Sequence, residues 1–446
     1  MEQNSNGKTF LFLGVFFVAA GTLLNQWTIG YFRPNPRPIV ELKNLVIIWT
    51  FQIISVGIGL IFVIFRNKLT EARLIKYYKN ISAVVTTLIV GFVLMNVVLY
   101  SASVLRLSLS GANSKAQEKG ISQKDIYPGF SDAQIAEILK ESWSRSFLYE
   151  PFTMFKEGSY HGTYVNVDEN GFRHVKDQEP WPPKKTNFNV FIFGNSTVFN
   201  YSVPDDETIA SYIQEKLRAA APEKKVAVYN FGRGFFYSSQ ERALYDKLLV
   251  AGYVPNVALF IDGQQEFGHP HDIPQFTQNL ESFFNRVSSY LVIFDNLPVT
   301  DWVRSLMAAR SNPQESTAAH YIPTKEELAD VEDGLQRYLA NKKLIEMSSL
   351  AFDVKPFFVW QPIAAYKYDK NFDPSVIVTD GPGAPLGYPR MAKYVTGHFM
   401  GNDFLYLADM QENVKRPIYV DGTHYSGEFS SEVASRIADF LKRNVF

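Results

Sequence analysis

The sequence predicts a three-layer α/β/α domain built on a parallel sheet and preceded by three transmembrane helices. Two patterns in the 446 residues support this prediction. From residue 188 onward, short apolar runs alternate with helical patterns, as in a parallel sheet that is covered by helices on both faces. The first hundred residues contain three long apolar runs that lack Asp, Glu, Lys and Arg.

Each of the three apolar runs is long enough to cross a bilayer of roughly 30 Å. They are Phe10–Tyr31, Leu45–Phe65 and Ile81–Tyr100. A cleaved signal peptide is an alternative for the first run, because Lys8 is the only basic residue ahead of it. Two further runs favour an uncleaved anchor, and we expect the chain to contact a lipid bilayer through these helices.

The charges of the connecting loops predict the orientation. The loop after Phe65 has five basic residues and one acidic residue, whereas the loop after Tyr31 has three basic residues and one acidic residue. The loop with more basic residues is expected in the cytoplasm, which places everything after Tyr100 on the extracytoplasmic side of the membrane. We therefore expect an integral protein of a bacterial inner membrane, with its large domain in the periplasm.

Composition excludes several classes of site. The net charge of −1 gives no basic surplus for nucleic acid. The absence of cysteine excludes disulfides and thiolate metal sites, and it fits an extracytoplasmic location. His269-Pro270-His271 resembles a metal-binding pair, but no carboxylate stands at clear ligand spacing. We expect no metal and no cofactor.

The chain divides into three predicted regions. Residues 1–105 form the membrane anchor, 106–150 a linker and a leading helix, and 151–446 the α/β/α domain with a helical insertion at about 271–352. In the leading segment, Ser131 is a good N-cap for a helix whose isoleucines fall on one face. Gly158–His174 alternates and then turns, which predicts an extended segment or hairpin.

The α/β/α domain is predicted from its strands and helices in turn. The strands are Phe188–Phe193, Lys225–Asn230, Val257–Ile261 and Pro356–Gln361, with Arg416–Val420 as a candidate fifth. The helices flanking them are Glu207–Leu217, Ser238–Leu249 and Glu428–Arg443. Because the carboxyl ends of parallel strands meet at one edge of the sheet, side chains that follow the strands are candidates for the site.

Ser196 follows the first strand where a helix is expected to begin. The helix N-terminus adds partial positive charge, which suits a developing oxyanion. The alternative is that Ser196 only caps the helix. Asp421 and His424 are three residues apart on a turn, so the carboxylate can hold one ring nitrogen while the other addresses a hydroxyl nucleophile. The alternative for this pair is a helix cap with a surface histidine.

Three groups are candidate donors to an oxyanion: the backbone N–H groups of Gly232 and Ser196 and the side-chain amide of Gln265. Asn195, beside the nucleophile, and Arg233 are the candidate substrate contacts. Arg233 could hold an anionic substrate, although an Arg in a glycine-rich loop also pairs commonly with a local carboxylate.

These residues resemble the motifs of the SGNH (GDSL-type) hydrolases. The corresponding segments, in the order of the family, are Gly194-Asn195-Ser196, Gly232, Gly263-Gln264-Gln265-Glu266 and Asp421-Gly422-Thr423-His424. The resemblance covers roughly Tyr160 to Phe446, and residues 170–173 also look like those of membrane-associated members. It implies a flavodoxin-like sheet, with Ser196 as nucleophile and Asn195 and Gln265 as departures from the family's Asp and Asn.

We therefore expect a membrane-anchored serine esterase that hydrolyses an acyl or acetyl ester of an envelope glycan or lipid through an acyl-enzyme. One alternative is an O-acyltransferase that uses the same triad and receives its acyl group from a membrane partner. A second is a non-catalytic binding or assembly module on the same fold, which the Gln265 departure favours. A lipase acting on bilayer lipids is a further option.

Overall fold

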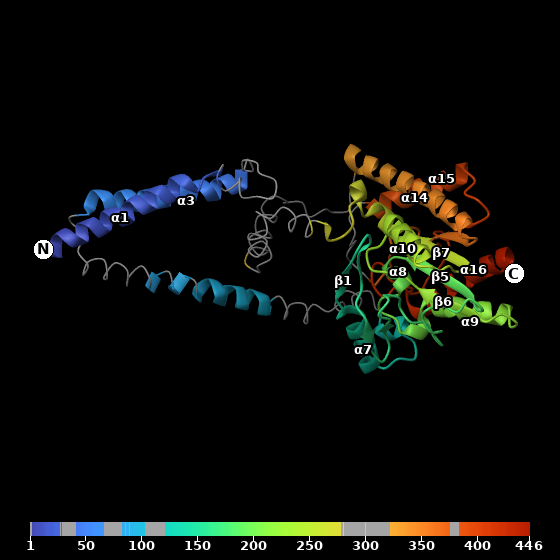
Figure 1. The fold of residues 1–446 in the computed structure, drawn as a ribbon. Coiled ribbons are helices and arrows are strands. Elements are labelled where there is room, and N and C mark those ends of the chain that lie inside the picture. Colours follow the sequence, from blue (N-terminus) through green and yellow to red (C-terminus); the bar gives the residue numbers. More distant parts are fainter. Residues whose placement is uncertain are drawn as a thin grey trace. The chain divides into compact units, whose positions relative to one another are not determined.

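The computed structural model describes residues 2–26, 28, 42–66, 83–102 (without 85 and 89), 121–277, 280, 299, 322–374 and 383–446 (Figure 1). The chain forms two compact units. One comprises Met1–Leu109 and Glu281–Glu315, and the other comprises Ser110–Leu280 and Ser316–Phe446.

In the first unit, helices α1 (Glu2–Leu23) and α3 (Leu42–Phe65) pack closely through small residues. A Cβ on Gly14 would lie 2.8 Å from the carbonyl oxygen of Gly59, and a Cβ on Gly59 would lie 2.7 Å from that of Gly14. The Ser55 hydroxyl donates a hydrogen bond to the Phe17 carbonyl at 2.8 Å. Close glycine contacts and interhelical hydrogen bonds of this kind are typical of helices that pack within a membrane.

Among the described residues, α3 is the helix whose length and apolar composition allow it to cross a membrane, over Ile48–Phe65. Its apolar side chains remain outward-facing: Ile53 is 73% exposed and Ile64 is 68% exposed. Shorter apolar helices cover Phe10–Leu23 and Thr86–Ala102. One of the three predicted spans therefore has a matching helix. The other two spans extend outside the described residues and stay predictions, as does the orientation.

The second unit contains a five-stranded parallel sheet in the order β6-β5-β7-β8-β9. The strands are β5 (Phe188–Gly194), β6 (Val226–Asn230), β7 (Val257–Asp262), β8 (Lys355–Trp360) and β9 (Phe404–Tyr406). The prediction of a parallel α/β sheet is confirmed. β5 is the first strand of this sheet along the chain, and the next two strands, β6 and β7, lie on opposite sides of it. The strand order therefore reverses between β5 and β7, which is where open α/β sheets bind ligands.

The predicted fifth strand is wrong. Arg416–Val420 forms no strand; within it, Tyr419 makes only an isolated bridge to Tyr425, and the edge position is taken by β9. Pro417 lacks the N–H that a ladder needs, which disfavours a strand there. The real strand has only three residues, Phe404–Tyr406, too few for alternation to be visible in the sequence.

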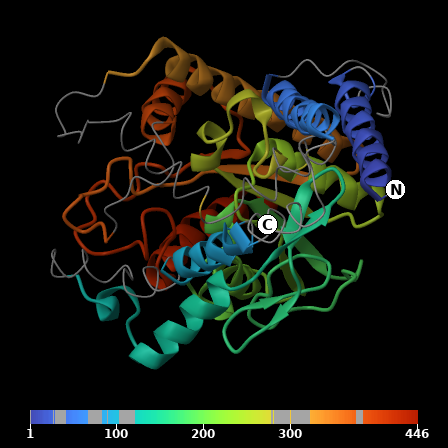
Figure 2. The same cartoon turned by 90° about the vertical axis from the view of Figure 1, so that its left-hand side faces the viewer.

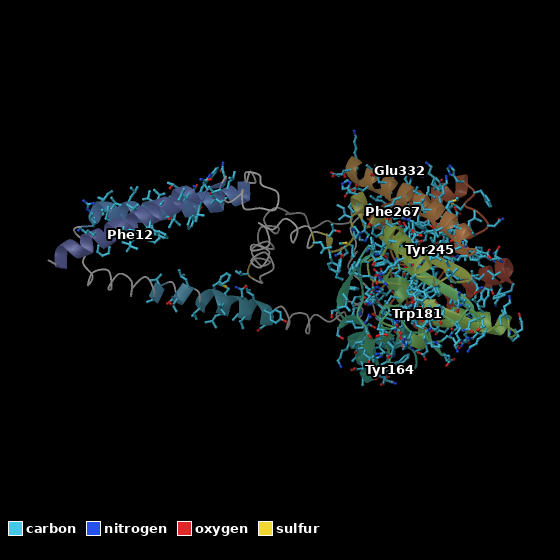
Figure 3. All side chains as sticks on the ribbon, viewed as in Figure 1. Phe12, Tyr164, Trp181, Tyr245, Phe267 and Glu332 are labelled. Atoms are coloured by element: carbon cyan, nitrogen blue, oxygen red, sulfur yellow. The ribbon has the colours of Figure 1, made fainter. Side chains whose placement is uncertain are left out.

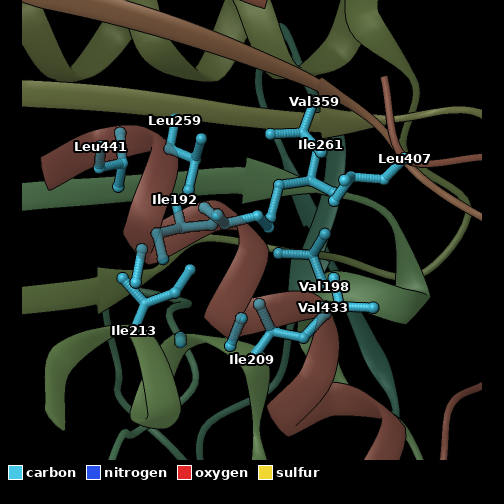
Figure 4. Packing of buried hydrophobic residues seen from close by; sticks show 14 of the residues in the cluster. Ile192, Val198, Ile209, Ile213, Leu259, Ile261, Val359, Leu407, Val433 and Leu441 are labelled. Atoms are coloured by element: carbon cyan, nitrogen blue, oxygen red, sulfur yellow. The ribbon is translucent and has the colours of Figure 1, made fainter. Parts of the chain in front are cut away.

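Helices cover both faces of the sheet. Helices α9 (Ile209–Ala220) and α16 (Gly427–Val445) pack on one face, and α10 (Ser238–Val250) and α14 (Lys325–Ala351) lie on the other (Figure 1). Figure 4 shows the first of these cores, where Ile192 of β5 meets side chains from the covering helices. Since both faces are buried, the strands read as nearly continuous apolar runs.

The opposite core is mostly aromatic. The rings of Phe193, Phe260 and Phe358 stack in succession across β5, β7 and β8, with centroid separations of 4.8 and 5.5 Å. The ring of Trp181, labelled in Figure 3, lies 4.6 Å from that of Tyr253 at the edge of this core. Offset ring packing of this kind adds about 0.5–1.5 kcal/mol per pair beyond the burial of area.

The structure describes only part of the predicted helical insertion. Helix α14 matches its last part, whereas most of the insertion between residues 278 and 321 lies outside the described residues. Helix α15 (Gly383–Gly397) was not predicted, because it contains Pro389 and several glycines. Packing explains one of them: a Cβ on Gly387 would lie 2.3 Å from the ring of Phe267.

The leading segment is part of the second unit. Ser131 caps α7 (Asp132–Trp143) in a capping box with Gln134, as its N-cap role predicts. Before it, α6 (Gln123–Ile126) and the buried Tyr127 also pack on this unit, where a tether had been expected. Figure 2 shows α7, in teal, at the periphery of the sheet domain.

A hairpin follows α7 and is joined to the domain by a buried ion pair. Its strands are β1 (Phe147–Glu150) and β2 (Met154–Glu157), and the shorter pair β3 (Tyr160–His161) and β4 (Asn166–Val167) comes next. Glu150 Oε2 lies 2.7 Å from Arg233 Nη1, and Lys247 lies 3.0 Å from Glu150 Oε1. Burial opposes ionisation of Glu150, but attraction to Arg233 and its hydrogen bonds outweigh burial and lower the pKa of Glu150 to about 2.

Replacing Glu150 with alanine is expected to lower the free energy of unfolding by about 3–5 kcal/mol, because the fully buried Arg233 is left without its counter-charge. Thermal and denaturant unfolding of the full chain in detergent, followed by near-UV circular dichroism, measures this. The difference should be full above pH 4.5, the ordinary pKa, and shrink as the pH falls toward 2 and the parent Glu150 is protonated.

Glu137→Ala is the matched control, since its pair with Lys140 is exposed and should contribute less than about 1 kcal/mol. Equal losses in the two variants would contradict the role given to the buried pair.

Candidate active site

The turn after β5 presents Ser196 at the carboxyl edge of the sheet. Asn195 is the N-cap of the single-turn helix α8 (Ser196–Phe199), and its Oδ1 accepts hydrogen bonds from the N–H and hydroxyl of Thr197 at 3.0 and 2.6 Å. Ser196 is half-buried, and as the first residue of the helix its N–H has no intrahelical acceptor. The hydroxyl and the free N–H therefore stand at the same point of the edge.

Asp421 and His424 form the pair that the sequence predicts. His424 Nδ1 lies 2.8 and 3.0 Å from the two carboxylate oxygens of Asp421. Asp421 Oδ1 also accepts the backbone N–H groups of Thr423 and His424, each at 2.8 Å. Burial acts to raise the pKa of Asp421, but attraction to His424 and these hydrogen bonds outweigh it, so the pKa lies below its ordinary value.

The second nitrogen of the ring is available. His424 is only 7% exposed, and within the described part of the chain its Nε2 has no hydrogen-bond partner. Because the Asp421 carboxylate accepts from Nδ1, the neutral ring carries its proton there, and Nε2 is the basic atom. This is the arrangement that a general base requires.

Tyr201, in the turn that begins at Ser196, lies next to His424. The N–H of Tyr201 donates to the Ser196 carbonyl at 3.3 Å, and the Tyr201 ring lies 5.6 Å from the imidazole of His424. Among the described residues, Ser196 Oγ and His424 Nε2 are not hydrogen-bonded to each other. In catalytic sites without substrate this bond is often long and tightens only when substrate binds.

Gln361, which follows β8, links the residue after Ser196 to the residue after His424. Its Oε1 lies 2.5 Å from the Thr197 hydroxyl and 3.3 Å from the Tyr425 hydroxyl. Each hydroxyl has one proton and already has a nearer or comparable acceptor, Asn195 Oδ1 for Thr197 and the Pro362 carbonyl at 2.6 Å for Tyr425.

An amide turned so that its nitrogen faces both hydroxyls satisfies all of these groups, since the NH₂ then donates to Thr197 and to Tyr425. In either orientation the single side chain of Gln361 holds the two turns together.

The predicted oxyanion donors differ in whether they are free to bind an oxyanion. The Gly232 N–H donates to Asn230 Oδ1 at 3.0 Å and is therefore in use. A Cβ on Gly232 would lie 2.5 Å from the Phe199 N atom, so glycine is needed for the close approach of α8. Gln265 Oε1 lies 3.3 Å from the Cβ position of Gly268, within its own turn. The neighbouring Gln264 instead reaches the Asp421–His424 turn, where its Nε2 donates to Thr423 Oγ1 at 3.4 Å.

The two predicted substrate contacts, Asn195 and Arg233, are both buried and hydrogen-bonded within the protein, and their role toward a substrate stays a prediction. Asn195 is 2% exposed and caps α8, and Arg233 is fully buried against Glu150 and the Phe155 carbonyl. The alternative for Arg233, a local carboxylate partner, is the one that the structure confirms. A short side chain after a strand serves first as a helix cap, and a fully buried guanidinium requires a counter-charge.

A buried acidic cluster lies behind the site. Glu241, Asp262 and Glu266 are nearly fully buried, and burial raises the pKa of each carboxyl above its ordinary value. Repulsion from other members of the cluster adds to this for Glu241 and Asp262. Glu266 accepts hydrogen bonds from the N–H and hydroxyl of Ser238 at 2.6 and 2.8 Å.

No group of His, Asp or Glu in the described part of the chain is arranged to hold a metal ion. The His269 ring faces the carbonyls of Ile273 and Phe235.

Three residues beside the site escaped the sequence analysis: Trp143, Tyr201 and Gln361. Gln361 ends a predicted strand, so the rule that selected Ser196 could have selected it too. Tyr201 lies five residues after the nucleophile with no pattern to mark it. Trp143 lies on a helix ahead of the predicted domain, and nothing in the sequence associates it with the sheet edge.

No protein-family model and no curated protein sequence matches this chain. Among solved structures, a protein of the G-D-S-L family from Desulfitobacterium hafniense is 9% identical, with a TM-score of 0.30, covering 58% of this chain and 99% of its own. An α/β hydrolase enzyme from the metagenome of Lake Arreo, Spain, is 13% identical, with a TM-score of 0.29, covering 56% and 94%.

A variant of an acetyl xylan esterase from Geobacillus stearothermophilus is 12% identical, with a TM-score of 0.31, covering 57% of this chain and 95% of its own. At this level of similarity the function has to be inferred from the residues of the site itself.

The link through Gln361 predicts energetic coupling between the two turns. Thr197→Val and Tyr425→Phe each remove one partner of Gln361, so their effects on the free energy of unfolding should be non-additive by about 0.5–3 kcal/mol. A double-mutant cycle by denaturant unfolding measures the coupling. Thr153→Val, whose hydroxyl donates to Glu150, shares no hydrogen-bond partner with Tyr425 and should be additive with Tyr425→Phe. Additivity in both cycles would contradict the coupling of the two turns through Gln361.

Proposed function

We propose that this protein is a serine esterase in which Ser196 is the nucleophile, His424 the general base and Asp421 the residue that orients the imidazole. The observation that carries the proposal is the Asp421–His424 pair. It is bonded at 2.8 Å through Nδ1, leaves Nε2 without a partner among the described residues, and lies beside the turn that presents Ser196. Helix caps and surface histidines do not leave a buried ring nitrogen unsatisfied, because that costs free energy.

The reaction proceeds in two halves. Ser196 Oγ attacks the ester carbonyl while His424 Nε2 takes the hydroxyl proton, and the Asp421 carboxylate stabilises the imidazolium. As the tetrahedral intermediate collapses, the C–O bond to the alcohol breaks and His424 returns the proton to that oxygen. Water then attacks the acyl-enzyme, with His424 again as base, and releases the acid and the free Ser196.

The negative oxygen of the intermediate needs donors that are not already engaged. The Ser196 N–H at the start of α8 is one, and a side-chain amide of the Gln264–Gln265 turn is the second. Gln264 already reaches the Asp421–His424 turn, whereas Gln265 would have to turn away from Gly268. Each such donor typically contributes about 2.7–4 kcal/mol to lowering the barrier.

The proposed substrate is an acyl or acetyl ester of an envelope glycan or lipid, and the proposed location is the outer side of a bacterial inner membrane. The apolar α3 and its close packing on α1 support attachment to a bilayer. If a sugar hydroxyl replaces water in the second half, the same residues perform O-acyl transfer, with a membrane partner supplying the acyl donor.

A non-catalytic binding module is the second candidate. It is favoured by the Gly232 N–H, which donates to Asn230, and by the missing hydrogen bond between Ser196 and His424. These two features describe a site that lacks part of its machinery.

Incubation of the full chain in detergent with a serine-directed fluorophosphonate separates the two candidates. Labelling at Ser196 is expected, and Ser196→Ala should abolish it. His424→Ala should slow it by about 10⁴-fold or more, because the hydroxyl loses its base. Ser435→Ala, which removes a helix hydroxyl bonded to the Ser431 carbonyl, is the control and should label like the parent. A folded protein that does not react with the reagent would establish the binding module instead.

A further inference from the structure

Helix α7 is fastened to the sheet domain at its last turns by unusually strong polar contacts. The carboxylate of Glu141 accepts three consecutive backbone N–H groups, those of Thr163, Tyr164 and Val165, at 2.7, 2.7 and 2.9 Å. Charge-assisted bonds of this kind are roughly twice as strong as neutral ones. The helix end is therefore fixed to the segment between β3 and β4.

A second set of contacts fixes the helix end to the turn after Ser196. Ser142 Oγ accepts the Ser202 N–H at 3.1 Å. Arg145 pairs with Glu157 at 3.1 Å, with both side chains at most 2% exposed, and its guanidinium lies 4.4 Å above the Phe199 ring. These contacts reach both α8 and the residues just after it.

Trp143, the last residue of α7, is what these contacts position. Its Nε1–H donates to Ser202 Oγ at 3.0 Å, which sets the plane of the indole. The indole lies 4.8 Å from the ring of Tyr201 and 5.4 Å from the imidazole of His424, with an angle of 74° between the indole and imidazole planes. The ring therefore adjoins the general base.

The exposure of Trp143 distinguishes it from its neighbours. Tyr201 is 6% exposed and His424 is 7% exposed, whereas Trp143 is 54% exposed. A tryptophan that served only to pack would gain about 25 cal/mol for each Å² of apolar surface it buried. Here the indole is held by its N–H and by contacts with Tyr201 and His424, while much of its apolar surface remains exposed to solvent.

We propose that Trp143 is a binding platform for the sugar ring of an ester substrate, and this inference rests on the esterase function proposed above. One face of a pyranose carries C–H groups and is apolar, while its rim carries hydroxyls. Such a ring can stack on an open indole and keep its hydroxyls in water. A long acyl chain would favour an enclosed apolar cavity over a half-exposed ring.

The platform would place the ester-bearing carbon of the sugar beside His424, which must deliver a proton to the leaving sugar oxygen. A rigid ring lowers the cost of ordering the substrate, because the indole is already held in place before binding. Binding energy from the non-reacting sugar then contributes to orientation at the carbonyl.

The test compares Trp143→Ala and Trp143→Phe in the full chain in detergent. The substrates are p-nitrophenyl acetate, which has no sugar, and O-acetylated oligomers of N-acetylglucosamine, glucose and mannuronate. Trp143→Ala should raise KM by about tenfold or more for at least one acetylated oligosaccharide and change kcat/KM for p-nitrophenyl acetate less than about threefold. Trp143→Phe should restore most of the binding. Phe399→Ala, which removes an equally prominent aromatic ring that is 83% exposed, should match the parent.

Three outcomes overturn the platform. An unchanged KM for every acetylated oligosaccharide would do so. Equal losses of kcat on sugar and p-nitrophenyl esters would show that Trp143 only positions His424. Losses that grow from p-nitrophenyl acetate to butyrate to octanoate would assign the ring to the acyl chain. Fluorophosphonate labelling of Ser196 in Trp143→Ala keeps the two proposals separate: labelling at the parental rate retains the esterase even when the platform is overturned.

Discussion

The candidate site depends on two turns, 228 residues apart in the sequence (424 − 196), being held at one edge of one sheet. Gln361 provides the direct link, since its side chain bonds both Thr197 and Tyr425, the residues that follow Ser196 and His424. Gln361 is itself held at the end of β8: its N–H donates to the Asp262 carbonyl at 2.9 Å, and its own carbonyl accepts the Tyr388 hydroxyl at 2.9 Å. The two turns can therefore move apart only if a buried polar network opens.

This network continues into the interior. Asp262 ends β7, and beyond it lie Glu241 and Glu266, three carboxyls that cannot all be ionised at such close range. Buried polar groups are expensive unless they are hydrogen-bonded, and Glu266 meets this requirement through both of its carboxylate oxygens. The bonds of Glu266 to Ser238, and of Asn341 to Ser238 and Ser239, extend this rigid base across α10 to α14. Buried polar side chains therefore lie beneath the site, whereas apolar packing stabilises the rest of the sheet.

The sequence supports the sheet and the Asp421–His424 pair for the same reason. Both are local patterns: a buried parallel strand is a short apolar run, and a carboxylate three residues from a histidine can reach its ring within one turn. Elements and contacts that depend on tertiary packing could not be predicted from the sequence. Helix α15 contains Pro389, and β9 has only three residues, so local sequence preference is weak in both. Each element forms because it packs on neighbouring parts of the domain. Arg233 and Gly232 follow a strand, which identified them as site residues, but the buried Glu150 and the backbone of α8 engage them from other elements.

The same limitation concerns the boundary of the sheet domain. A domain predicted at 151–446 omits α7, because a capped amphipathic helix after a polar stretch reads as a leader. The compact unit instead begins at Ser110, and the carboxylate of Glu141 accepts the N–H groups of Thr163 and Tyr164. Without α7 these donors and Val165 would lose their partner, Glu157 would lose Arg145, and the imidazole of His424 would lose the indole beside it. The helix that precedes the sheet thus belongs to the immediate surroundings of His424.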